Sequence, residues 1–283
     1  MKARQALLII PFIVGALACS AVQAQTSSPA TQFTVGAKIW HAAWQSYLPT
    51  GYTGITPDGT PALANSVNEV EGKTRTDVLP QLAVRHGDYF ASMNYGRFKT
   101  DFNAQRTSVT LPTGQNLITS RSDHFKRREA DLNLGYFVTP EVAVALIYKD
   151  ATEDRATSLG IAPQSVPTVR TRARGVLLGV SGSFAVIDKL RLYVQGGYGP
   201  ARLRFHFPDP ALGTAKTDGS YIIGEIGLSY PLVTGTAGGV GVTAALGYRT
   251  QTVKTDSYGD PFQINRDLRD VREGAVLSLN FTL

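Results

Sequence analysis

The chain of 283 residues contains one cysteine, two methionines and two tryptophans. The cysteine, Cys19, lies in an N-terminal segment that we expect to be removed, so the mature protein has no disulfides, no thiol chemistry and no cysteine metal ligands. Beyond that segment, no apolar run reaches the roughly 20 residues that a transmembrane helix needs. The mature chain therefore cannot cross a membrane as a helix.

Residues 1–24 are predicted to form a secretory signal peptide. Two cations precede an apolar run over residues 6–18, and the tripeptide VQA at 22–24 matches an A-x-A-like cleavage site. The mature chain would begin near Gln25, and the formal charge of +6 would fall by two. Lipidation at Cys19 and retention of the segment as a membrane anchor are the alternatives.

The last stretch, residues 275–283, reads AVLSLNFTL and alternates strictly between apolar and polar side chains. Such alternation predicts a β-strand with one greasy face and one polar face. The closing strand of a membrane β-barrel has this pattern, because it pairs with the first strand and presents its apolar face to lipid.

The same alternation recurs along the chain, and every second connection is short. We predict ten strands, over 33–44, 75–84, 89–99, 126–138, 142–149, 170–184, 190–205, 221–230, 240–251 and 275–283. The intervening stretches 47–73, 151–169, 208–219 and 254–271 lose the period and are predicted as long polar loops, whereas 107–120 is predicted to continue the third and fourth strands as a hairpin.

Short turns alternating with long loops predict an all-β fold: a closed antiparallel up-and-down transmembrane β-barrel over residues 25–283, with periplasmic turns and extracellular loops. A soluble β-sandwich also alternates, but it has no reason to keep every second connection short. The chain resembles the small outer-membrane β-barrel proteins of Gram-negative bacteria. The resemblance implies a place in the cell outer membrane, and recognition of strand 275–283 by the barrel assembly machinery. Such barrels usually end in an aromatic residue, whereas this chain ends in Leu283.

The inward-facing positions of the predicted strands carry charges of both signs in similar number. A barrel of this size is barely wider than its own interior side chains, so these charges must pair or be hydrated. We expect a polar plug, with a narrow channel for small polar solutes as the alternative. The predicted lumen charges are Lys38, Arg75, Asp77, Arg127, Glu129, Asp131, Lys149, Arg191, Glu225 and Arg249.

The outward-facing positions end in cations on the loop side of the strands. A lipid-facing cation costs about 2–4 kcal/mol at the membrane midplane but about 0–1 kcal/mol near the interface, so these residues belong at headgroup level. Arginine matches phosphate with two hydrogen bonds, and we expect these cations to contact lipopolysaccharide rather than form a merely solvated rim. This basic collar consists of Arg97, Lys99, Lys126, Arg128, Arg170, Arg172, Arg174, Arg202 and Arg204.

Catalytic patterns are sparse. Ser122-Asp123-His124, and His206 with Asp209, are the local candidates for a rim enzyme acting on lipid A or peptides, but neighbours on a strand face opposite ways. We expect no enzyme activity, cofactor, metal site or nucleic-acid partner. We also expect the protein to be a monomer. Aromatic side chains near the strand ends are expected to form interfacial girdles: Trp40, Trp44, Tyr47, Tyr89, Tyr136, Phe184, Tyr230 and Tyr248.

Overall fold

The computed structural model describes the backbone of residues 31–55, 61–110, 116–159, 162–206, 213–235, 239–255 and 268–283. It describes side chains over 31–46, 71–102, 124–156, 170–206, 213–235, 239–255 and 269–283. The predicted signal peptide lies outside the described residues, as do the side chains of Tyr47, Ser122, Asp123 and Asp209.

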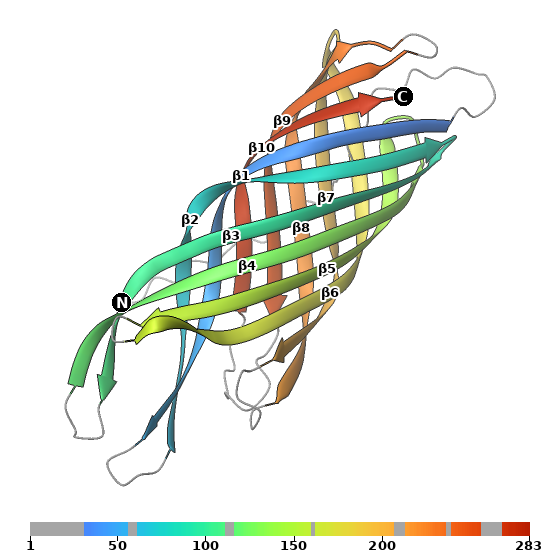
Figure 1. Cartoon of the computed structure of the whole chain (residues 1–283). Helices are drawn as coiled ribbons and strands as arrows, with labels where there is room; N and C mark the ends of the chain where they lie inside the picture. The colour runs from blue at the N-terminus through green and yellow to red at the C-terminus, as the bar shows by residue number, and fades with distance from the viewer. Residues whose placement is uncertain are drawn as a thin grey trace, which may run out of the picture.

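The described chain forms one closed barrel of ten antiparallel strands, which confirms the predicted fold (Figure 1). Each strand pairs with its sequence neighbours, and the last pairs with the first. The strands are β1 (Thr31–Ile55), β2 (Pro61–His86), β3 (Tyr89–Thr110), β4 (Asn116–Phe137), β5 (Val142–Leu159), β6 (Ala162–Ile187), β7 (Leu190–His206), β8 (Thr214–Val233), β9 (Gly241–Thr255) and β10 (Leu268–Thr282).

The barrel closes through β1 and β10, whose register runs from Thr34 opposite Thr282 to Gln45 opposite Val271. At the end of the chain, Phe33 and Leu283 exchange backbone hydrogen bonds of 2.8 and 3.1 Å. A closed ladder leaves no strand edge, which is the condition for a sheet to lie in lipid.

The short connections β2–β3, β4–β5, β6–β7 and β8–β9 meet at one end, here called the turn end, and the opposite end is the loop end. Gly87, with φ of 58°, and Asp188, with φ of 44°, take the left-handed conformation that tight turns need. Within the described residues, no helix is long and apolar enough to cross a membrane.

The strands extend further toward the loop end than the hydrophobic pattern predicts. The predicted hairpin over 107–120 is confirmed, since Thr110 faces Asn116. The prediction of long loops over 47–73 and 151–169 is wrong: β1 and β2 continue to Ile55 and from Pro61, and β5 and β6 are separated by two residues. Where both faces of a strand are polar there is no alternation to detect, although the ladder continues.

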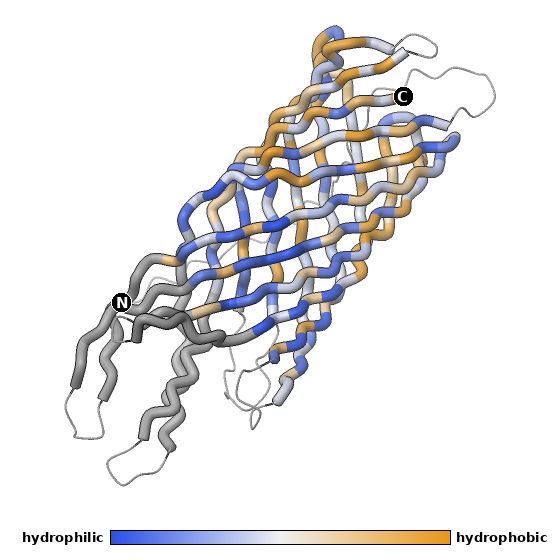
Figure 2. Tube along the Cα trace, in the orientation of Figure 1, coloured by the Kyte–Doolittle hydropathy of each residue, from blue (hydrophilic) through white to orange (hydrophobic). Residues whose placement is uncertain are grey.

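Hydrophobic residues are concentrated along the strands in the turn-end part of the barrel, and hydrophilic residues predominate toward the loop end (Figure 2). The large exposed hydrophobic residues include Phe33, Val35, Ile39, Val78, Leu82, Met93, Leu132, Leu134, Val144, Leu146, Tyr148, Val176, Leu178, Tyr198, Ile222, Ile226, Leu228, Leu246, Leu277, Leu279 and Phe281. We call this surface the apolar belt. Apolar side chains on the outside and charged side chains on the inside are the arrangement expected when lipid surrounds the barrel.

The pairing of β2 with β3 is interrupted in the wall. Gly72 pairs with Phe102 and Gln81 pairs with Asn94, but residues 73–80 of β2 and 95–101 of β3 have no register partner across this boundary. The interrupted stretch is called the β2–β3 seam, and β2 bends away from β3 there (Figure 1). Pro80, which has no amide hydrogen, lies within it. A second irregularity lies nearby, between Ala42 and Trp44 in the β1–β2 pairing.

Candidate functional site

A chain of alternating charges crosses the barrel interior. It joins eight side chains from six strands, and each contact is an ion pair no longer than 3.8 Å. In order from the loop-end side, the chain consists of Asp270, Arg127, Glu129, Lys149, Asp131, Arg249, Glu225 and Lys38. Four cations alternate with four anions, so the charges of this ion-pair chain cancel.

Lys149 lies at the middle of this ion-pair chain and is fully buried. Its Nζ donates to Glu129 Oε1 at 2.7 Å and to Asp131 Oδ1 at 2.6 Å. Gln251 donates to the second oxygen of Glu129 at 2.8 Å. Charges removed from water to this degree are stable only when they are paired and hydrogen-bonded, and this geometry meets that condition.

Four interior charges lie outside the strands that the sequence predicts. Asp270 and Arg272 fall in the predicted loop 254–271 or just beyond it, and Glu153 and Arg155 fall in the predicted loop 151–169, yet all four are buried. Extending the parity of the neighbouring predicted strands would place them inside. Asp270 and Arg272 share the parity of the inward-facing Asn280, and Glu153 and Arg155 share that of Lys149.

Aromatic rings fill the interior beside the ion-pair chain, and two of them correct the predicted girdle. Trp40 and Trp44 are 1% and 2% exposed and face the lumen, because they share the parity of Lys38. Arg272 stacks over the Phe98 ring at 3.6 Å and over Trp40 at 4.3 Å. Tyr89, Tyr136, Phe184, Tyr230 and Tyr248 are exposed on the outside, as a girdle requires.

Trp44 and Asp270 connect the aromatic rings to the ion-pair chain. The indole N–H of Trp44 donates to Asp270 Oδ2 at 2.9 Å, and the hydroxyl of Ser46 donates to the same oxygen at 2.8 Å. Arg127 holds the other carboxylate oxygen at 2.7 Å. Both oxygens of Asp270 are thus used within the interior.

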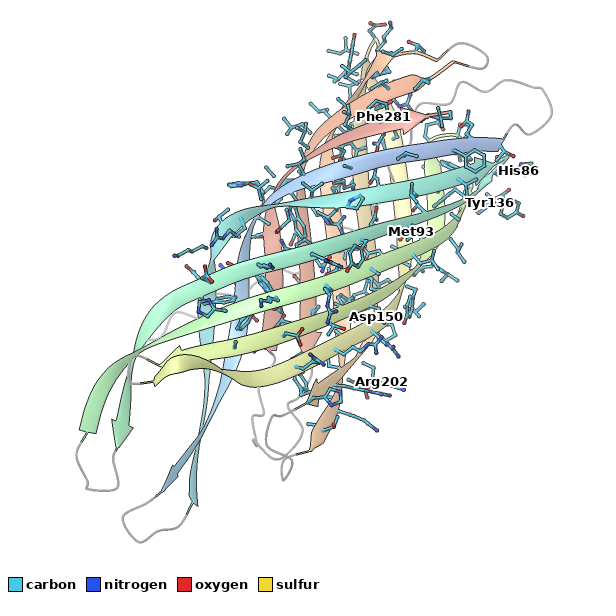
Figure 3. All side chains as sticks on the ribbon, in the orientation of Figure 1. His86, Met93, Tyr136, Asp150, Arg202 and Phe281 are labelled. Carbon is cyan, nitrogen blue, oxygen red and sulfur yellow. The ribbon has the colours of Figure 1, made fainter. Side chains whose placement is uncertain are left out.

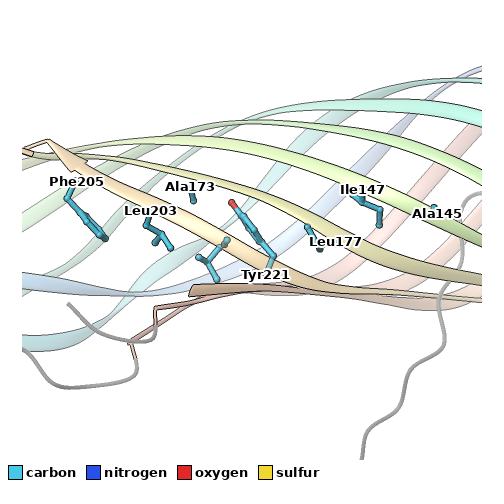
Figure 4. Packing of buried hydrophobic residues seen from close by; sticks show 9 residues of the cluster. Ala145, Ile147, Ala173, Leu177, Leu203, Phe205 and Tyr221 are labelled. Carbon is cyan, nitrogen blue, oxygen red and sulfur yellow. The ribbon is translucent and has the colours of Figure 1, made fainter. Parts of the chain in front are cut away.

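A hydrophobic cluster on the inner face of β5 to β9 fills the remaining side of the lumen (Figure 4). It runs along the barrel from Phe205 through Leu203 and Tyr221 to Leu177 and Ile147 (Figure 4). Toward the turn end, a cavity of about 60 Å³ borders Lys38, Asp131 and Arg249. Because one water molecule needs about 10–15 Å³, this cavity has room for water.

Two of the predicted lumen charges have other surroundings. The prediction that Arg75 faces the lumen is wrong. Its side chain is 50% exposed, and its Nη2 lies 3.0 Å from Oδ2 of Asp101, on the outer face of β3. The seam leaves no β3 residue opposite Arg75, so its side chain turns outward. Arg191 is partly buried near the turn end and donates to the carbonyl and hydroxyl of Ser183. Asp77 lies inside and accepts from Arg272 at 2.9 Å.

All nine residues of the basic collar project outward, beyond the apolar belt. Asp150 and Arg202 mark this zone, nearer the loop end than Met93 and Tyr136 (Figure 3). Carboxylates lie among the cations. Arg172 donates to Asp150 at 2.6 and 3.0 Å, and Arg174 donates to the same carboxylate at 3.1 Å.

The other collar cations differ in how they are paired. Asp154 accepts from Arg170 and lies 3.5 Å from Arg128, while Arg202 lies 3.8 Å from Asp218. Arg97 donates to the hydroxyl of Tyr95 at 3.0 Å. Within the described residues, no ion pair is formed by Lys99, Lys126 or Arg204.

Neighbouring hydrogen-bond partners lower the pKa of two carboxyl groups outside the apolar belt. The hydrogen bond from Arg172, with the charges of Arg172 and Arg174, lowers the pKa of Asp150 below its ordinary value. The hydrogen bond with His124 lowers the pKa of Asp101 in the same way. Both carboxylates therefore stay ionised to lower pH than a free aspartate.

The histidines make simple contacts. His124 Nδ1 lies 2.6 Å from Asp101 Oδ1, and His206 Nδ1 lies 2.9 Å from the hydroxyl of Thr214. Asp123 and Asp209, their sequence neighbours in the predicted enzyme sites, have side chains outside the described residues. Among the side chains that are described, no group of three or more histidines, cysteines or carboxylates could hold a metal ion.

No known protein family matches the chain, and no curated protein matches it. Among solved structures, it is similar to the outer membrane protease OmpT from Escherichia coli, at 9% identity and a TM-score of 0.48 over 89% of this chain and 95% of that one. The toluene transporter TodX of Pseudomonas putida aligns at 8% identity and a TM-score of 0.33, over 90% of each chain. The attachment invasion locus protein Ail of Yersinia pestis aligns at 9% identity and a TM-score of 0.26, over 91% of this chain and all of that one. At these values the likeness is one of barrel fold and extends to no activity.

Proposed function

We propose that this protein is a monomeric, non-enzymatic outer-membrane β-barrel with a structural or surface-binding role. In this proposal, paired charges fill the lumen and the basic collar contacts lipopolysaccharide. One observation carries the proposal: the interior charges are paired and buried, whereas the outer cations are exposed beyond an apolar belt. The inside is thus built for stability and the outside for contact with an anionic membrane surface.

The packing of the interior supports a lumen that does not conduct ions. The ion-pair chain joins strands on opposite sides of the lumen, and aromatic rings and the hydrophobic cluster occupy the space beside it. Single-channel conductance of the refolded protein, from residue 25 onward, in planar bilayers tests this point. We expect no current steps across the bilayer, and discrete openings would favour the narrow channel for small polar solutes.

The collar supports contact with lipopolysaccharide, because its cations project outward just beyond the apolar belt. Arginine and lysine at this level can reach the phosphates of the outer leaflet, and their charges stay outside the hydrocarbon core of the membrane. Protein extracted in mild detergent should keep lipopolysaccharide bound, as measured by native mass spectrometry. If the protein extracted from native membranes carries no lipopolysaccharide, this role is contradicted.

The closing strand supports the remaining partner of the proposal, the barrel assembly machinery. Residues 275–282 form the end of β10, Leu283 follows, and Phe281 is exposed on the outer face (Figure 3). A Phe281→Ser variant should accumulate in the periplasm if this strand is recognised during insertion. Normal insertion of that variant would remove Phe281 from the recognition element.

The absence of catalysis in this proposal is tested separately. Lipid A from cells that express the protein, or variants lacking His124 and His206, should give identical mass spectra. A lipid A species that appears only with the unaltered protein would instead favour the rim enzyme.

A further inference from the structure

Two groups of four collar cations have the same geometry on the outer face. On β3 and β4, Arg97 lies directly opposite Arg128 and Lys99 directly opposite Lys126. On β6 and β7, the corresponding pairs are Arg172 with Arg204 and Arg174 with Arg202. We call these groups the β3–β4 square and the β6–β7 square.

Like charges in such positions repel. Residues directly opposite in an antiparallel pair have Cβ atoms about 4.5–5.5 Å apart, and like charges there are destabilising. A square of four cations therefore needs anions nearby, either from the protein itself or from a ligand.

The β6–β7 square is supplied with anions by the protein. Asp150 is hydrogen-bonded to both Arg172 and Arg174, and Asp218 lies 3.8 Å from Arg202. Two carboxylates thus reach three of the four cations.

The β3–β4 square has much less compensation. Lys99 and Lys126 make no ion pair within the described residues, and Arg97 contacts the neutral Tyr95, through its hydroxyl and its ring. Arg128 lies 3.5 Å from Asp154, but that carboxylate accepts its hydrogen bond from Arg170.

The other carboxylate at the edge of the β3–β4 square is also occupied. Asp101, two residues beyond Lys99 on the same face, is held by Arg75 at 3.0 Å and by His124 at 2.6 Å. Within the described residues, the positive charge of the square is therefore only partly compensated, since Asp154, opposite Lys126 in the β4–β5 ladder, and Asp101 both bond to other cations.

The surface next to the β3–β4 square indicates what kind of anion it would hold. Moving down the same two strands on the same face, the next pairs are Tyr95 with Ala130 and Met93 with Leu132. Met93 and Leu132 are 48% and 46% exposed and belong to the apolar belt. Because a strand rises about 3.4 Å per residue, Arg97 lies only about 14 Å above Met93.

From this arrangement we propose that the β3–β4 square binds a phosphate group of a membrane lipid, whose chains lie on the belt below it. A phosphate monoester carries a charge of about −1.5 to −2 and three acceptor oxygens, which suits a cluster of arginine and lysine donors. The site deepens the proposed function, since it assigns lipopolysaccharide contact to one group of residues and one chemical group.

The test compares the two squares in variants of equal charge change. Lys99→Gln/Lys126→Gln removes two of the four charges of the β3–β4 square, and Arg202→Gln/Arg204→Gln removes two from the β6–β7 square as the matched control. Refolded proteins are titrated with diphosphorylated lipopolysaccharide in detergent and followed by native mass spectrometry. The first variant should weaken binding about tenfold or more, as expected for loss of charge-assisted contacts, and the control should weaken it by a clearly smaller factor. Equal weakening, or greater weakening in the control, overturns the assignment.

Two further arms identify the ligand group. Enzymatically dephosphorylated lipopolysaccharide should bind the unaltered protein as weakly as the Lys99→Gln/Lys126→Gln variant binds the intact lipid, and equally tight binding would exclude phosphate. Inorganic phosphate should not displace the lipid, whereas displacement would assign the site to free phosphate. If the unaltered protein binds no lipopolysaccharide at all, the proposed function fails; if it binds and the two squares behave alike, only this inference fails.

Discussion

Lys38 of β1 and Glu225 of β8 are joined across the lumen, with the lysine Nζ donating to both carboxylate oxygens at 2.7 Å. The two strands are separated by β9 and β10 in the sheet, so this contact spans the interior and not the wall. Both residues are buried, and Arg249 approaches the same carboxylate at 3.0 Å. The lumen is therefore part of what holds the barrel together.

A double-mutant cycle on this pair should reveal the coupling. Lys38→Met and Glu225→Gln each leave a buried charge with fewer partners, whereas the double variant removes both charges at once. The free energy of unfolding lost in the double variant should be smaller than the sum of the two single losses by about 0.5–3 kcal/mol. Urea titrations in lipid vesicles measure it, and strictly additive losses would show that the two residues are independent.

Removing the central cation should have a larger effect. Lys149→Met leaves Glu129 and Asp131 buried without the cation between them, and loss of one partner from a buried ion pair costs about 3–5 kcal/mol. The fluorescence of Trp40 and Trp44 provides the unfolding signal, since both rings lie inside the barrel.

The control for this variant is Lys189→Met, in the exposed turn between β6 and β7. Its effect should stay within about 0.5 kcal/mol, as for other surface substitutions. Equal stability of the Lys149 and Lys189 variants would mean that the ion-pair chain contributes nothing to folding.

The β2–β3 seam should exchange its amide hydrogens faster than the rest of the wall. Amides of residues 73–79 and 95–101 that point across the seam have no ladder partner, so solvent reaches them without unfolding of the sheet. Hydrogen exchange followed by NMR in nanodiscs measures each amide. Amides in the unbroken β4–β5 ladder at 126–132 serve as the reference, and equal protection in both places would contradict an interrupted ladder.

The ionisation of Asp150 should depend on Arg172. The pKa of this carboxyl is lower in the folded protein than in the unfolded chain, so its stabilising contact is fully present above the ordinary aspartate value of about 3.9. The contact should persist as the pH falls below that value and be lost only as the pH passes through the lowered pKa. Carbon NMR of the labelled carboxyl in the folded barrel measures this, and Arg172→Gln should raise the pKa. An unchanged titration in that variant would assign the shift to another cause.

The two faces of the strands show how far alternation alone can reach. It placed Phe33, Val35 and Ile39 on the outside, and it placed Lys38 on the inside, because side chains of an extended strand alternate without exception while the pairing is regular. It also correctly placed the nine cations of the basic collar on the outer face. It failed for Arg75, where the pairing breaks, and it gave no signal for Glu153 or Asp270, where no apolar partner face marks the strand.

The sequence by itself determined the class of fold, the ten strands, the side of the short turns and the direction in which most side chains point, since all of these follow from the period of two and from turn residues. Only the tertiary structure decided which charges meet. Lys38 and Glu225 are 187 residues apart, and Arg97 faces Arg128 only because the register of β3 on β4 brings them together. Register and closure depend on the hydrogen bonds between strands, and a single strand's pattern does not contain them.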